Sequence, residues 1–173
     1  MGVDQTRVHD GDVTIGGLTL SLFHQDSGAP EESPMVLLDV SDLNLKVLGG
    51  GVKLSYDPQQ VGQLLTSAFP VSATGWMAEA KDCHEPSSGS LTAYCVAAPV
   101  PDDAYQLFTV LSTPATRPTA VALLPRGFEL VGGGAQAVYG KGAGSYLYAS
   151  HPLVHPECPT VVSIRMYKWM ACV

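Results

Sequence analysis

Two runs of three glycines are the sequence feature that most limits how this chain can fold. The glycines 49–51 follow Leu48, and the glycines 132–134 follow Val131, 83 positions further along. Such a run weakens a strand through backbone entropy and lost packing, so it usually marks a bulge, a sharp bend or a close approach of two backbones. Both runs stand at the same point of an otherwise matching pattern, so we expect both to bend the chain in the same way.

The match extends outward from the glycines and indicates a tandem duplication. The matching pairs are Leu22 with Leu107, Pro34 with Pro118, Leu38 with Leu124, Tyr56 with Tyr139, Gly62 with Gly144, Leu65 with Leu147, Pro70 with Pro152, and Cys95 with Cys172. Repeat 1 then covers residues 18–98 and repeat 2 covers residues 103–173, within one globular domain of residues 1–173. The connection at 99–103 is too short for a flexible linker between independent domains.

Alternation of apolar and polar residues predicts an all-β fold. Period-two alternation is typical of half-buried strands, and it runs through residues 18–22, 46–54, 63–69, 76–82 and 90–96. Residues 104–111 have apolar residues at helical spacing, but we predict a strand there because their counterpart in repeat 1 is one. About five or six strands per repeat predict a pseudo-twofold β-barrel or a two-sheet β-sandwich.

The charge balance excludes several classes of partner. The formal net charge is −7, with 9 Lys and Arg against 16 Asp and Glu. So few cations cannot neutralise a phosphate backbone, and we therefore expect no nucleic-acid partner. No apolar run approaches the roughly 18 residues of a membrane span. The first residues lack the regions of a signal peptide, which favours the cytoplasm. The sequence leaves a homo-oligomer open, and the four cysteines favour buried, reduced thiols over disulfides.

The segment 75–85 holds the densest set of chemically versatile side chains. An extended strand would place Trp76, Asp82 and His84 on one face, with Ala78 and Ala80 between them. An indole beside small residues, then a carboxylate and an imidazole, offers a stacking surface and hydrogen-bond partners for a sugar or another polar ring.

The opposite face of the same strand would carry Glu79 and Lys81, which could form an ion pair. Repeat 2 does not conserve the series, so we expect a single site. Two alternatives stay open. Trp76 could be a core anchor, and Lys81 with Asp82 a solvated strand end.

Other candidate chemistry is weaker. His151, His155 and Cys158 contain ligand types that zinc accepts, but their spacing fits no zinc pattern and prolines interrupt it, so we expect no metal and no other cofactor. His151 takes the position of Phe69 in repeat 1, and it remains a candidate ligand-binding residue. Residues 140–144 resemble a phosphate-binding loop without its Lys-Ser/Thr ending, and we predict a hairpin turn.

The order of motifs around these residues resembles a group of small microbial modules. Those modules carry a GGG…LLTAS-x-P…W-x-A-x-SKDH pattern, which this chain matches in the glycines 49–51, the segment 64–70 and the series from Trp76 to Asp82. The chain departs from the pattern at Ala80 and in the displacement of His84 by one position. The resemblance implies the same layout of strands and names no ligand.

Two functions follow as hypotheses. The first is a lectin-like module that binds a glycan or another small molecule through Trp76, Lys81, Asp82, His84 and His151. The alternative is a small β-barrel enzyme of the isomerase or cyclase type, with an apolar substrate inside the barrel. Its acid and base would be Asp82, Glu79 and His84, because burial can raise a carboxyl pKa into the working range.

Overall fold

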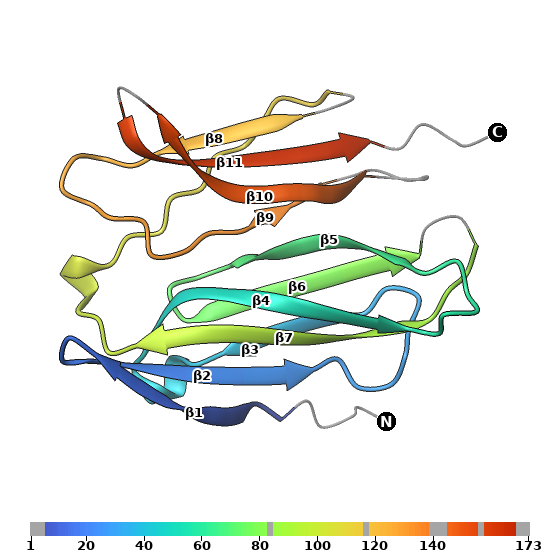
Figure 1. Ribbon diagram of the computed structural model, residues 1–173. Coiled ribbons are helices and arrows are strands. Elements are labelled where there is room, and N and C mark those ends of the chain that lie inside the picture. The colour runs from blue at the N-terminus through green and yellow to red at the C-terminus, as the bar shows by residue number, and fades with distance from the viewer. Residues whose placement is uncertain (1–5, 83–84, 116–117, 139–144, 156–157, 169–173) are drawn as a thin grey trace.

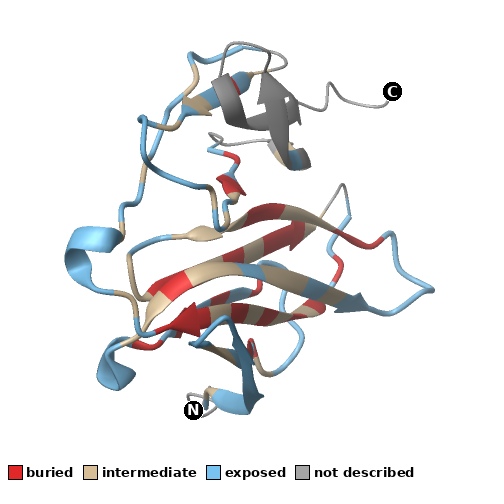
Figure 2. Cartoon of the chain, turned by 60° about the vertical axis from the view of Figure 1, so that its left-hand side comes forward, coloured by how far each residue is buried: buried red, intermediate tan, exposed pale blue. Residues whose placement is uncertain are grey.

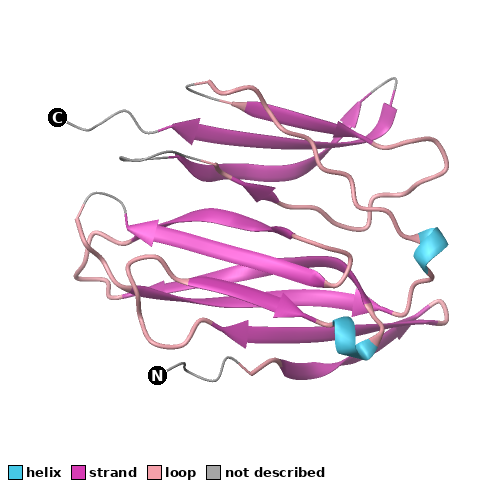
Figure 3. Ribbon diagram, turned by 180° about the vertical axis from the view of Figure 1, so that it is seen from behind, coloured by secondary structure: helices cyan, strands magenta, loops and turns pink. Residues whose placement is uncertain are grey.

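The computed structural model describes residues 6–82, 85–115, 118–138, 145–155 and 158–168, and these residues form an all-β fold (Figure 1). The strands are β1 (Val8–Ile15), β2 (Leu18–Asp26), β3 (Met35–Asp39), β4 (Lys46–Tyr56), β5 (Gln63–Pro70), β6 (Gly75–Asp82), β7 (Gly89–Ala98), β8 (Thr119–Leu123), β9 (Ala135–Gln136), β10 (Ser145–His155) and β11 (Cys158–Lys168). Two single-turn 3-10 helices, η1 (Ser41–Leu43) and η2 (Asp102–Ala104), interrupt them (Figure 3).

The strands form three antiparallel sheets. Sheet A has the order β1-β2-β7-β4, sheet B the order β3-β6-β5-β9, and sheet C the order β10-β11-β8. Sheets A and B share one core, and sheet C lies beyond β5 and β9, on the side of the molecule away from β1 (Figure 1). Within the described residues the sheets are not closed into a barrel, so of the two predicted architectures the barrel is wrong, and sheets A and B are two open four-stranded antiparallel sheets.

The core between sheets A and B combines the large indole of Trp76 with many small side chains. Figure 2 shows the buried residues in red on the strands of these sheets. Its members are Phe23, Val36, Leu38, Val40, Val47, Trp76, Ala78, Ala80, Leu91, Ala93, Cys95 and Ala97. The alanines come from the facing strands β6 and β7, and they leave the volume that the indole of Trp76 fills. Burying an aliphatic or aromatic side chain of this size stabilises the fold by about 1.5 to 3 kcal/mol.

Gly50 in β4 lets the Trp76 ring lie directly against the backbone of sheet A. A Cβ atom at this position would stand 2.6 Å from Cδ2 of Trp76 and 2.3 Å from the carbonyl oxygen of Tyr94. The ladder between β4 and β7 also shifts register between Val47 and Gly49. The first glycine run therefore marks both a bulge and a close approach.

The second glycine run lies in different surroundings. The glycines 132–134 precede β9 in an irregular segment, whereas 49–51 lie inside β4, so the expectation that both runs bend a strand in the same way is wrong. The two runs nevertheless touch. A Cβ atom on Gly132 would stand 2.0 Å from the carbonyl oxygen of Leu48 and 2.8 Å from Cα of Gly49. Glycine is required at 132 because two backbones meet there.

The strands predicted within residues 18–98 all form, at β2, β4, β5, β6 and β7. The strand predicted for 104–111 does not. Residues 102–104 form η2, and Tyr105 donates a hydrogen bond from its hydroxyl to the carbonyl oxygen of Val47, at 2.9 Å. In repeat 1, β2 pairs with β7, and β7 pairs with β4 on its other side. A strand at 104–111 would need a counterpart of β7 as its neighbour, because both edges of β7 itself are occupied.

Sheet C has the strand order of part of sheet B. The strands β8, β11 and β10 follow one another as β3, β6 and β5 do. The ladder between β5 and β6 is interrupted between Leu65 and Ser67, and the ladder between β10 and β11 is interrupted between Leu147 and Ala149. The two interruptions are 82 positions apart, the same shift that aligns Leu65 with Leu147 in the sequence.

Candidate functional site

The segment predicted to carry the site forms β6, an inner strand of sheet B between β3 and β5. Its residues alternate between the two faces of the sheet, as the sequence pattern predicts. Trp76, Ala78 and Ala80 belong to the core between sheets A and B. Met77, Glu79 and Lys81 occupy the opposite face, which we call the outer face of sheet B.

The structure places the indole of Trp76 in the core and not at a ligand. Its side chain is 1% exposed, and its ring packs over Gly50. A buried ring offers no stacking surface to a sugar, so the interpretation of Trp76 as a core anchor replaces the binding role. Its Nε1 has no acceptor within reach among the described residues.

Asp82 lies at the end of β6 on the same face as Trp76, and it is half-buried. Its backbone N–H donates to the carbonyl oxygen of Glu32 at 3.0 Å, which ties the strand end to the segment before β3. Asp82 is separated from Glu79 by the plane of the sheet. The structure therefore does not bring these two predicted acid-base residues to one face.

Two predicted site residues cannot be placed around β6. His84 and Cys83 lie outside the described residues. The predicted hairpin turn at 140–144 and Cys172, the counterpart of Cys95 in repeat 2, also lie outside them. The backbone of His151 pairs with Ser163 in sheet C, and its side chain is not described.

Glu79 is the candidate side chain whose contacts on the outer face are best defined. Its Oε2 accepts a hydrogen bond from Oγ of Ser67 in β5 at 2.5 Å. It also accepts a longer one from Nε2 of Gln136 in β9, at 3.5 Å. Ser67 is 1% exposed, Glu79 is half-buried and Gln136 is exposed. The carboxylate thus stands at the boundary between the packed interior and solvent, held from one side by two donors.

The neighbours of Glu79 across β5 and β6 form a mixed strip on the outer face. Directly paired residues of antiparallel strands share a face, so Phe69 stands beside Met77, Ser67 beside Glu79, and Leu64 beside Lys81. Lys81 is 6% exposed and is not a free cation. We call Ser67, Phe69, Met77, Glu79, Lys81 and Gln136 the outer strip.

Apolar side chains border the outer strip on the side of β3. Met35 pairs with Glu79 and is 54% exposed, and Leu37 pairs with Met77 and is 49% exposed. Gly75 lies beyond them, where a Cβ atom would meet Val71 at 3.1 Å and Leu37 at 3.6 Å. The carboxylate is therefore set in a surface that is otherwise largely apolar.

The chemistry of the described residues limits what the site can be. The described residues contain no group of three or more His, Cys, Asp or Glu that could hold a metal ion. Cys95 is a free cysteine in the core, and burial raises the pKa of its thiol to about 12, so it is not a ready nucleophile. No helix of the described chain has the length and apolar character to cross a bilayer.

No known protein family matches this chain, and neither a curated protein nor a solved structure matches it. The outer strip is thus defined by its own geometry.

Sequence reasoning missed Ser67 and Gln136. The partner of Ser67 could have been found, because the tight connection between Pro70 and Trp76 fixes the register that sets Ser67 opposite Glu79. Gln136 gives no such signal. It stands 57 residues from Glu79 and reaches it only because β9 pairs with the free edge of β5.

Proposed function

We propose that the protein is a binding module for a small polar ligand of the glycan class, and that the ligand contacts the outer strip. The observation that carries this proposal is the half-buried Glu79 carboxylate. Ser67 and Gln136 orient it, and it lies on an apolar face beside Phe69 and Met77.

The arrangement suits a sugar for two reasons. A carboxylate has about four lone-pair positions, so two donors on Glu79 leave acceptor capacity for neighbouring hydroxyl groups. Charge-assisted hydrogen bonds to a fixed carboxylate are stronger than those between neutral groups. The C–H face of a pyranose ring also packs well on apolar and aromatic side chains, which Phe69 and Met77 supply two residues from Ser67 and Glu79.

The enzyme alternative has less support. It requires an enclosed apolar chamber with an inward acid or base, and sheets A and B enclose a core filled by Trp76 and its neighbours. Glu79 and Asp82 also lie on opposite faces of β6, so they are unsuited to act as an acid-base pair on one substrate.

A panel of methyl glycosides of common hexoses tests the proposed function by thermal shift and calorimetry. We expect at least one glycoside to bind the wild-type chain, and Glu79→Gln to lower its affinity at least about tenfold, because the charge-assisted bond to the ligand is lost. Glu129→Gln is the matched control, since Glu129 is exposed and does not belong to the strip.

The proposal fails if no glycoside of the panel binds the wild-type chain. It also fails if one binds Glu79→Gln as tightly as Glu129→Gln. Asp82→Ala serves as a second variant. We expect it to keep affinity, because Asp82 lies on the other face of the sheet.

We also infer that sheet C and the β3-β6-β5 part of sheet B descend from one duplicated unit. Three correspondences support this. The strand orders agree, the interruption after Leu65 matches the one after Leu147, and Pro70 opposite Trp76 corresponds to Pro152 opposite Val162. The outer strip then has no equivalent in sheet C, where Arg165 stands at the position of Glu79 by its pairing with Ala149.

A further inference from the structure

The strand β1 is exposed along its whole length (Figure 2). Among the described strands β1 pairs only with β2, so its other edge has unpaired backbone N–H and C=O groups. Such an edge is a template for another strand, and proteins usually protect it with charges, prolines or a covering segment.

The polarity of this hairpin is the reverse of what a free surface requires. Phe23 faces the core, so the residues before and after it in β2 face outward, and their partners in β1 do the same. The outward face carries Val8, Val13, Ile15, Leu18, Leu20 and Leu22, together with His24, which bonds Asp10. The inward face of the hairpin carries Thr14 hydrogen-bonded to Thr19 at 3.3 Å. Val13 is 60% exposed and Ile15 is 63% exposed.

The acidic groups on β1 are satisfied within the chain. Asp10 accepts a hydrogen bond from His24 at 2.8 Å, and Asp12 pairs with His9 at 2.9 Å. Residues 13–23 carry no charge. A strand that joined this edge would therefore meet the apolar side chains of Val13 and Ile15, and a carboxylate, that of Asp12, that is already paired with His9.

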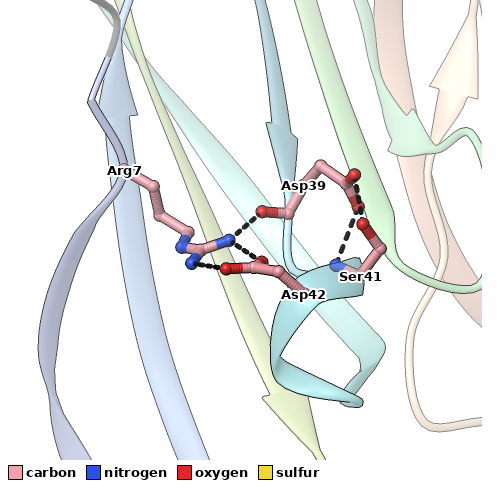
Figure 4. Close-up of polar contacts among 4 residues, drawn as sticks. All are labelled: Arg7, Asp39, Ser41 and Asp42. Atoms are coloured by element: carbon pink, nitrogen blue, oxygen red, sulfur yellow. Dashed lines mark hydrogen bonds and ion pairs between the residues drawn. The ribbon is translucent and has the colours of Figure 1, made fainter.

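The start of β1 is anchored, which holds the edge in place (Figure 4). The guanidinium of Arg7 donates to both carboxylate oxygens of Asp42, at 2.7 and 2.8 Å, and to the carbonyl oxygen of Asp39. It also lies 5.6 Å from the ring centre of Phe23. A fixed strand loses less entropy on pairing than a mobile one.

We propose that β1 is an interface for a second copy of this chain, with the two β1 strands antiparallel and Val13 opposite Val13 of the second copy. This register places Asp12 opposite Thr14 and Gly11 opposite Ile15, so no two carboxylates face each other. The space above Gly11 suits Ile15 of the second copy, because a Cβ atom on Gly11 would meet nothing within 4 Å.

The register also respects the irregularity of β1. The ladder with β2 shifts between His9 and Gly11, and from Gly11 to Ile15 it is regular. The pairing uses only this regular part, which is centred on Val13. It joins two four-stranded sheets A into one continuous eight-stranded sheet.

The charge of the chain determines how such a dimer responds to salt. Each copy carries a formal net charge of −7, so the copies repel one another at long range, and added salt screens this repulsion. The contact is short and apolar. We therefore expect a dissociation constant in the micromolar range that falls as ionic strength rises.

Analytical ultracentrifugation of the full chain over a concentration series tests the interface. We expect the wild-type chain to form dimers, and Val13→Lys to raise the dissociation constant at least about tenfold, because two like charges would stand opposite each other. The matched control is Val61→Lys, at a 57% exposed position in the connection between β4 and β5, which we expect to dimerise like wild type. Ile15→Lys provides a second disruption should Val13→Lys unfold.

Hydrogen exchange locates the contact independently. On dimerisation, the backbone amides of residues 11–15 should gain protection, and the outer strip should not. A chain that stays monomeric at every concentration overturns the proposal and leaves the edge to a strand of another protein. Dimers that both lysine variants of the hairpin leave intact, or protection elsewhere, overturn it equally.

Discussion

Replacing Gly50 with alanine measures how closely sheet A approaches the Trp76 ring. The added methyl group would stand 2.3 Å from the carbonyl oxygen of Tyr94 and 2.6 and 2.7 Å from Cδ2 and Cε2 of Trp76. Each distance is about 1 Å short of ordinary contact, in a core packed too densely for either group to retreat freely. Overpacking of this kind costs about 1 to 3 kcal/mol, and we expect the upper end because one obstacle is backbone.

Gly51 provides a control one residue away in the same strand. A Cβ atom there would meet nothing within 4 Å, and neither Gly50 nor Gly51 has a positive φ. Gly51→Ala should therefore stabilise the fold by about 0.5 to 1 kcal/mol, because alanine loses less backbone entropy than glycine. Any difference between the two variants then reports the contact and not the glycine.

Urea unfolding and thermal melting of the two variants give the answer. For a chain of this length, a loss of 3 kcal/mol lowers the melting temperature by about 6 to 12 °C. We expect Gly50→Ala to show that loss and Gly51→Ala to melt at or above the wild-type temperature. Variants that differ by less than about 0.5 kcal/mol would refute the packing of Trp76 on Gly50.

Two further predictions concern the contact between the glycine runs and the behaviour in acid. Gly132→Ala should destabilise the chain by about 2 kcal/mol, since its methyl group would collide with the carbonyl oxygen of Leu48; an unchanged urea midpoint would contradict that contact. A hydrogen bond from the Ser41 hydroxyl lowers the pKa of Asp39, so the stability that this group contributes is present above about pH 4 and is lost as the pH falls through its folded-state pKa. Asp39→Asn should therefore cost more at pH 7 than at about pH 3, and an equal cost at both values in urea titrations would argue against it.

The sequence was sufficient to place most strands of residues 18–98, because alternation of period two directly reflects the geometry of a strand. It was not sufficient to decide which face of β6 is buried and which carries the candidate site. Alternation separates Trp76 from Glu79 but does not say which of them looks inward. That decision depends on Gly50, which faces Trp76 across the core from another sheet.

The third sheet and the segment before it depended on information that is not local. Residues 104–111 match a strand by alignment, yet a strand forms only where a neighbour offers its edge, and that neighbour is absent from the described part of the second half. Gln136 contacts Glu79 for a similar reason. The strand β9 pairs with an edge of β5, and no sequence pattern near residue 136 predicts that pairing.

The contact of Gly49 with Gly132 has a consequence for how the two parts of the chain are joined. Side chains at a junction can change rotamer and absorb small displacements, but two bare backbones in contact have no such freedom. Any side chain introduced at Gly132 therefore has to move the backbone of one part away from the backbone of the other.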